Sequence, residues 1–183
     1  CAFSQNAATV STSDNMCATD NSVVRGGAVS FEYATVWLLR SSVTDNLLQP
    51  SETSTSATGG GVFVGDIGTV VRITSTNMSG NSASLFERSA GGALGASRGG
   101  ASILCSDVTA SNNSATRGGA FFVDGALLQL LNSRISNNVA QLRGGGFFAV
   151  SKRETNCSLL PLSPTHCGNS TIILNATSIT GNT

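Results

Sequence analysis

The amino-acid sequence predicts an all-β protein, a parallel β-helix of about five coils with three short strands in each coil. Three observations support this prediction. A four-residue motif of the form apolar-x-x-Asn recurs along the chain, and a Gly-Gly pair follows each copy except the last. Apolar residues stand at fixed distances before each Asn. The units differ in length at only two places, as expected for loops inserted into a repeat scaffold.

The repeated Asn and Gly residues are expected to form the corners of the coil. The Asn column is Asn6, Asn46, Asn81, Asn113, Asn138 and Asn182. Asn tolerates a left-handed backbone, and its amide can bond to the Asn above and below in a stacked turn. The glycine pairs are Gly26-Gly27, Gly59-Gly60, Gly91-Gly92, Gly118-Gly119 and Gly144-Gly145. We expect them to form tight corners that a Cβ would block.

The apolar columns predict the strands and the core. Ten residues before each Asn stand Val36, Val71, Ile103, Leu128 and Ile172. Eight residues before it stand Leu38, Ile73, Cys105, Leu130 and Leu174. Three residues before it stand Val43, Met78, Ala110, Ile135 and Ile179. The period of two between the first two columns indicates a strand with both side chains on one face. One strand therefore follows Gly-Gly, a second carries these two columns, and a third ends at Asn.

The chain is expected to be a single β-helix domain, 1–183, that is part of a longer chain or an assembly. Insertions are predicted at 7–24, 47–58 and 82–90, between Asn and Gly-Gly, and at about 151–170. No apolar stretch is long enough to span a membrane as a helix. The formal net charge is zero, which argues against a nucleic-acid partner. Only 11% of residues are charged, which suits a regular β array or a glycosylated surface.

The five cysteines divide into one core residue and four loop residues. Cys105 stands in a core column, so we expect a buried, unreactive thiol. Cys1 with Cys17, and Cys157 with Cys167, are local pairs within insertions, where disulfides would close small loops. Such disulfides would place the protein in an oxidising compartment.

The phrases Phe3-Ser4-Gln5-Asn6, Met78-Ser79-Gly80-Asn81-Ser82-Ala83 and Arg117-Gly118-Gly119-Ala120 resemble the repeats of the chlamydial polymorphic outer-membrane proteins. Similar repeats occur in predicted surface proteins of algae and protists. The resemblance spans nearly the whole chain, although only the first phrase has Phe at the apolar position. It implies a right-handed, pectate-lyase-like β-helix, a location at the cell surface, and a role in adhesion or surface architecture.

Catalysis is the main alternative, because this fold also includes pectate lyases and polygalacturonases. Asp66 and Asp124 share a turn position two coils apart, roughly 10 Å by strand spacing. That separation exceeds the roughly 5–9.5 Å of glycosidase carboxylate pairs. His166 is the only His and has no evident Ser or Cys partner. We therefore assign no catalytic residue, no cofactor and no metal ligand.

Three sets of residues are candidates for contacts at the surface. Arginines precede glycine pairs at Arg25, Arg98, Arg117 and Arg143, and they indicate either a solvated stripe or a contact for anionic glycans. Candidate glycosylation sites are Asn77, Asn112, Asn156, Asn169 and Asn175. In the strand after Gly-Gly both alternating sets are apolar, so one of them must face outward. The set of Phe63, Phe122 and Phe148, with Trp37 in the next strand, indicates an interface, unless insertion loops cover it.

Together these features predict an extracellular, non-enzymatic β-helix module that builds a surface layer, a filament or an adhesin stalk. Its expected partners are copies of itself or flanking repeats, stacked head to tail, because open β-helix ends expose unpaired strand edges. Glycans are a further class of partner. A carbohydrate-active enzyme or a glycan-binding module remains the alternative.

Overall fold

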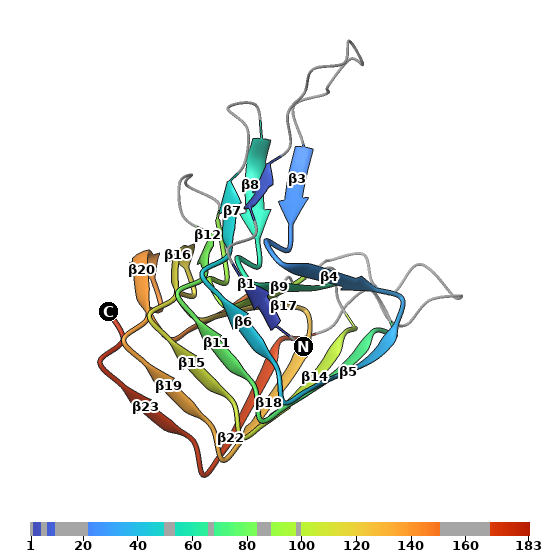
Figure 1. Cartoon of the computed structure of the whole chain (residues 1–183), viewed down its shortest axis with the longest axis vertical. Helices are drawn as coiled ribbons and strands as arrows, with labels where there is room; N and C mark the ends of the chain where they lie inside the picture. The colour runs from blue at the N-terminus through green and yellow to red at the C-terminus, as the bar shows by residue number, and fades with distance from the viewer. Residues whose placement is uncertain are drawn as a thin grey trace.

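The computed structural model describes residues 2–4, 7–9, 22–49, 54–65, 68–83, 89–97, 100–150 and 169–183. Within these ranges every regular element is a β-strand. The described residues hold no helix long and apolar enough to cross a membrane. Strands of successive coils lie side by side and in parallel, so the chain is a parallel β-helix (Figure 1).

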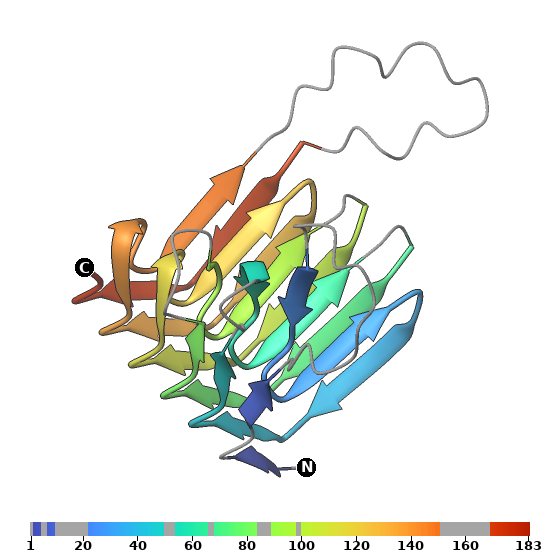
Figure 2. The ribbon, with the colours of Figure 1, turned by 90° about the horizontal axis from the view of Figure 1, so that it is seen from above.

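Four long sheets run along the stack, and we call them sheets A to D. Sheet A contains β1 (Ala2–Ser4), β6 (Ser42–Thr44), β11 (Asn77–Ser79), β15 (Thr109–Ser111), β19 (Arg134–Ser136) and β23 (Ser178–Thr180). Sheet B contains β2 (Ala7–Thr9), β7 (Leu47–Gln49), β12 (Ser82–Ala83), β16 (Ser114–Arg117) and β20 (Val139–Arg143). Sheet C contains β4 (Val29–Glu32), β9 (Val62–Gly65), β13 (Leu94–Ser97), β17 (Phe121–Asp124) and β21 (Phe147–Val150). Sheet D contains β5 (Thr35–Leu39), β10 (Val70–Thr74), β14 (Ser102–Ser106), β18 (Leu127–Leu131) and β22 (Thr171–Asn175). Figure 2 shows the coils following one another in chain order along the stack.

Each complete coil has four strands, so the prediction of three strands was wrong. After Gly-Gly the chain runs through sheets C, D and A, and a fourth strand, in sheet B, follows the Asn. That strand lies in segments that the sequence analysis assigned to insertions. It is short, and its buried residues include Ala83 and Ala115, which give no strong apolar signal.

The insertions interrupt the sheet B strand rather than replace it. Ala83 pairs with Ala115, and Ala90 bridges to Arg117, so the chain pairs with β16 both before and after residues 84–88, which lie outside the described ranges. In the two preceding coils the strand portions beyond the insertion are β3 (Ser22–Arg25) and β8 (Ser54–Thr58), which pair in parallel. A small second core of Leu48, Ala57, Ala83 and Ala115 lies at this place. The insertion predicted at about 151–170 lies between β21 and β22 in the sequence. Its residues 151–168 lie outside the described ranges.

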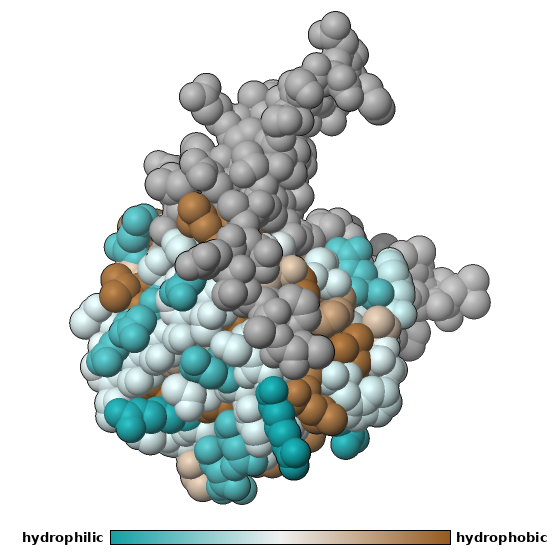
Figure 3. Space-filling model, viewed as in Figure 1, coloured by the Kyte–Doolittle hydropathy of each residue, from teal (hydrophilic) through white to brown (hydrophobic). Residues whose placement is uncertain are grey.

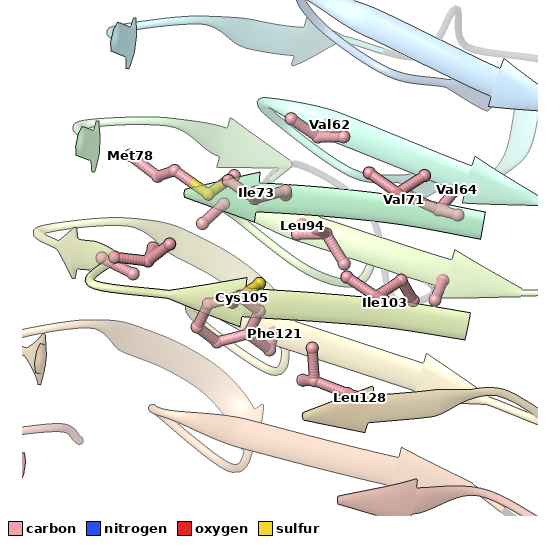
Figure 4. Packing of buried hydrophobic residues seen from close by; sticks show 14 of the residues in the cluster. Val62, Val64, Val71, Ile73, Met78, Leu94, Ile103, Cys105, Phe121 and Leu128 are labelled. Carbon is pink, nitrogen blue, oxygen red and sulfur yellow. The ribbon is translucent and has the colours of Figure 1, made fainter. Parts of the chain in front are cut away.

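The register of the strands confirms the three predicted core columns. In sheet D, Val71 pairs with Val36 and with Ile103, and the same column continues through Leu128 to Ile172. The other two columns align in the same way. Side chains from sheets A, C and D meet inside the coil in one continuous cluster (Figure 4). Each fully buried Val, Leu, Ile or Phe contributes about 1.5–3 kcal/mol relative to an exposed one.

The two glycines of each pair are required for different physical reasons. The first glycine has a left-handed backbone, with φ between 62° and 79° in all five pairs. The second glycine packs against the next coil: a Cβ on Gly92 would overlap the carbonyl oxygen of Gly119. The same overlap would occur between Gly27 and Gly60, and between Gly119 and Gly145. The pairs therefore set both the corner and the spacing of the coils.

The side chains of Asn46, Asn81, Asn113, Asn138 and Asn182 form a continuous hydrogen-bonded ladder. Nδ2 of each Asn donates to Oδ1 of the next, at 2.8, 3.0, 2.9 and 2.8 Å along the stack. The backbone N–H of Asn113 also donates to Oδ1 of Asn138, and Nδ2 of Asn113 donates to the Met78 carbonyl. An inner Asn therefore uses both amide donors and its acceptor oxygen. Asn6 lies outside the described residues.

The sequence predicts that the ladder Asn adopts the left-handed backbone of the corner. In the structure, the residue before the ladder Asn adopts it instead. These residues are Asp45, Gly80, Asn112, Asn137 and Gly181, with φ between 55° and 68°. Gly, Asn and Asp are the residues that adopt this conformation most readily. The ladder Asn itself points into the coil, where its amide is buried.

Candidate interaction surfaces

The outer face of sheet D carries apolar residues among polar ones and has one exposed aromatic ring. Trp37 pairs in register with Arg72, and the row continues through Leu104 and Gln129 to Ile173. Trp37 is 58% exposed, and Leu39 lies in the neighbouring row of the same face. Among the described residues that alternate with the core columns on this sheet, Arg72 is the only charged one. Apolar (brown) patches lie beside β5 in Figure 3.

The outer face of sheet A is polar. Its outward positions are Ser42, Thr44, Asn77, Ser79, Thr109, Ser111, Arg134, Ser136, Ser178 and Thr180. None of these residues is apolar, and most carry a hydroxyl group. The exposed large apolar side chains of the described residues are Tyr33, Trp37 and Leu39 in the first coils, Val139 and Leu142 on sheet B, and Ile173, Leu174 and Ile179 in the last coil.

The predicted aromatic strip divides into separate parts in the structure. Phe63 is fully buried and contributes nothing to an exposed surface, which corrects its assignment to an interface. Phe122 and Phe148 are half-buried and stack on the outer side of sheet C, with ring centroids 6.1 Å apart. Trp37 belongs to sheet D. The sequence pattern could not separate these cases, because alternation shows which residues share a face but not what covers that face.

The stacked pair Phe121–Phe147 shows which of the two alternating sets of side chains in sheet C faces the core. Phe121 and Phe147 stack with centroids 5.3 Å apart, and Phe121 has no exposed surface. Val123, two residues further along the strand, is also fully buried in the same cluster. The set that contains Phe121 therefore faces the core, and the set that contains Phe122 faces outward.

The last coil exposes residues that belong to the core columns. Leu174 is 45% exposed and Ile179 is 44% exposed. At the opposite end of the sheet D column, Leu38 is 5% exposed; in sheet A, Val43 is fully buried and β1 pairs with its strand on the outer side of the stack. The two ends of the described stack therefore differ. Core surface is accessible where β22 and β23 form its edge.

Cys105 is a buried free thiol, as its place in the core column predicts. Burial away from water raises the pKa of the Cys105 thiol to about 12, because the thiolate would lose its hydration. At neutral pH it is therefore neutral and unreactive. Cys1, Cys17, Cys157 and Cys167 lie outside the described residues, so their pairing stays a prediction.

Four of the five candidate glycosylation sites are exposed. Asn77 lies on the outer side of β11, and its Nδ2 donates to the hydroxyl of Ser79, the third residue of its own sequon. Asn112, Asn169 and Asn175 are also exposed. Asn156 lies outside the described residues. The accessible positions are compatible with glycan attachment, which stays a prediction.

The predicted arginine stripe is only partly described. Arg25, Thr58, Ala90, Arg117 and Arg143 occupy one column at the end of the sheet B strands. Arg98 lies outside the described residues. Arg117 and Arg143 are therefore the two neighbouring basic residues of this column whose side chains the structure describes. Nε of Arg117 is buried without a hydrogen-bond partner.

The residues considered for catalysis are not brought together in the described ranges. Asp66 and His166 lie outside them, and Asp124 ends β17. The described part of the chain contains no group of three or more His, Cys, Asp or Glu side chains arranged to hold a metal ion.

The fold and these surfaces define a class, the parallel β-helix repeat proteins. No family model, no curated protein and no solved structure matches the chain. The resemblance to surface-protein repeats therefore rests on the sequence phrases alone.

Proposed function

We propose that the chain is an extracellular structural or adhesive β-helix module, a building block of a cell-surface layer or filament. The exposed core at the β22–β23 edge is the observation on which this proposal rests. Inside the stack, the equivalents of Leu174 and Ile179 are buried by the next coil. A further coil stacked on this edge, from another copy or from flanking repeats, would bury them in the same way.

The chemistry of the last coil suits such stacking. Asn182 accepts from Asn138 and donates to the Ile135 carbonyl. The backbone N–H of Asn138 also donates to Oδ1 of Asn182, as each inner coil does to the next. A coil that carries the same Asn phrase would therefore extend both the ladder and the apolar columns. The extracellular location is supported by the low charge content and by the exposed sequons.

The test uses two variants of the same strand. Ile179→Asp places a charge on the inward side of β23, and Ser178→Asp places one on its outward side. Sedimentation velocity over a range of protein concentrations, with electron-microscope imaging of the particles, measures association. We expect the wild type and Ser178→Asp to associate and Ile179→Asp to remain monomeric. A monomeric wild type at all concentrations, or equal association of both variants, contradicts stacking at this edge.

A further inference from the structure

The strongest unexplained feature lies where the sheet B strands end beside the outer face of sheet C. One column there contains Thr58, Ala90, Arg117 and Arg143. A second column, on sheet C, contains Phe63, Gly95, Phe122 and Phe148. A Cβ on Gly95 would overlap the side-chain methyl of Thr58 in the preceding coil. The two columns are therefore in direct contact.

The repeat places Arg117 beside the outer aromatic pair. Arg117 stands two coils after Thr58 in the first column, and Phe148 stands two coils after Gly95 in the second. From the repeat of Thr58 and Gly95 we infer that Arg117 lies beside Phe148, although the register of β16 against β20 shifts between Ala115 and Arg117. Arg143 then follows on the neighbouring strand of the first column, about 4.8 Å further along the stack.

Two features of these arginines call for an anion. Nε of Arg117 is buried without a hydrogen-bond partner, and such groups in native structures usually bind an ion or water. Arg117 and Arg143 are also directly opposed like charges on neighbouring strands, an arrangement that is destabilising when it is not compensated. A guanidinium group binds planar oxyanions through two parallel hydrogen bonds.

The aromatic pair indicates what carries the anion. The Phe122 and Phe148 rings are half-buried and stacked at 26° to each other. They offer an apolar surface on the side of sheet C that the repeat sets beside the arginine column. A small inorganic anion has no apolar surface that could pack against these rings. A sugar ring with its C–H face on the aromatic pair and an acidic group on the guanidinium uses both.

We propose that this corner binds an acidic saccharide chain through Arg117, Arg143 and the Phe122–Phe148 pair. The acidic group is a carboxylate or a sulfate, both of which match the fork of donors on a guanidinium. This site is separate from the β22–β23 edge, so the inference does not depend on the proposed stacking.

The test measures binding of the full chain to dextran sulfate, to a polyuronate and to neutral dextran. Measurements at low salt and at physiological salt separate the ionic contribution. The two acidic polymers identify the source of the oxyanion, and neutral dextran measures the contribution of the sugar alone. We expect binding to at least one acidic polymer and much weaker binding to neutral dextran.

Matched variants assign the binding to the corner. Arg117→Gln and Arg143→Gln should each weaken binding about tenfold or more, as expected for loss of a charge-assisted hydrogen bond. Arg134→Gln on sheet A and Arg72→Gln on sheet D remove exposed arginines from other faces and should change affinity less than threefold. Phe122→Leu should weaken binding at both salt concentrations. Thermal unfolding checks that each variant is folded, and the exposed Arg143 keeps the test decisive if Arg117→Gln unfolds.

Three outcomes would overturn the proposal. One is equal binding of neutral and acidic dextrans, and another is equal loss of affinity in the sheet A and sheet D controls. The third is the absence of binding to every acidic polymer at low salt. Measuring in the Ile179→Asp background separates these outcomes from a failure of the stacking proposal, because saccharide binding is then recorded without association.

Discussion

The side-chain amide of Asn81 donates a 3.0 Å hydrogen bond to Oδ1 of Asn113, and this oxygen also accepts the backbone N–H of Asn81 at 2.9 Å. One buried oxygen therefore satisfies two donors of the preceding coil. The relation repeats between Asn113 and Asn138. The ladder is therefore a structural element of every inner coil.

Asn113→Ala should be among the most destabilising single changes in the chain. It leaves the backbone N–H of Asn81 and one hydrogen of its Nδ2 without partners in the core, while the other hydrogen still donates to the Val43 carbonyl. Each unsatisfied buried group costs about 1–3 kcal/mol. We expect a loss of several kcal/mol, on the order of 3, in the free energy of unfolding measured by urea denaturation. Asn77→Ala, on an exposed strand position, should change it by less than about 0.5 kcal/mol. Equal effects would show that the ladder adds no stability.

Gly92→Ala should disrupt the stacking of two coils. A Cβ on Gly92 would overlap backbone oxygens of Ser114 and Gly119, which cannot move without separating the strands. We expect a loss of more than about 3 kcal/mol, or failure to fold, by the same denaturation measurement. Gly68→Ala is the control: its φ is also left-handed, but a Cβ there meets nothing within 4 Å. It should cost only about 1–2 kcal/mol, the cost of the backbone conformation. A milder effect at Gly92 than at Gly68 would contradict this account.

Ser89→Ala should stabilise the protein. The Ser89 hydroxyl is fully buried and has no hydrogen-bond partner, so its removal relieves a desolvation cost of about 1 kcal/mol or more. Ser133→Ala is the matched control in an equally buried place, where the hydroxyl donates to the Leu131 carbonyl and accepts from the Val108 N–H. That change should destabilise. The two melting temperatures, measured by circular dichroism, should move in opposite directions.

Cys105 should make stability fall at high pH. Its pKa is about 12 in the folded protein and 9.0 for the unperturbed thiol, so the unfolded state loses its proton first as pH rises. The stabilisation is complete below pH 9 and declines between pH 9 and 12, by about 1.4 kcal/mol per pH unit at most. Cys105→Ala should remove this part of the pH dependence, which comparison of the two unfolding curves at pH 8 and pH 10.5 would measure. The native thiol should also resist iodoacetamide at pH 8 and react only after unfolding. Rapid alkylation of the folded protein would contradict burial of the thiol.

Some features of this protein follow from its sequence alone. A parallel β-helix requires the same residue type at the same point of every coil, because each side chain packs on its equivalent one coil away. The columns that contain Ile73 and Ile135 could therefore be read directly, and so could the burial of Cys105. The two glycine roles and the Asn ladder also leave a repeated mark in the sequence. The residue before each ladder Asn is Asp, Gly or Asn, a signal of the left-handed corner that the Asn column itself obscured.

Other features were decided only by the tertiary structure. The fourth strand differs in composition from coil to coil, from Ser82-Ala83 in β12 to Leu47–Gln49 in β7, so its pairing to neighbouring coils defines it more than its own composition does. Phe63 and Phe122 share one phase, yet one is buried and the other half-exposed, because the covering of an outer face depends on neighbours distant in sequence. The contact between the Arg117 column and the outer side of sheet C likewise arises from how the corner folds. Repetition determines what faces inward, whereas the covering of an outer position also depends on contacts between segments that are distant in the sequence.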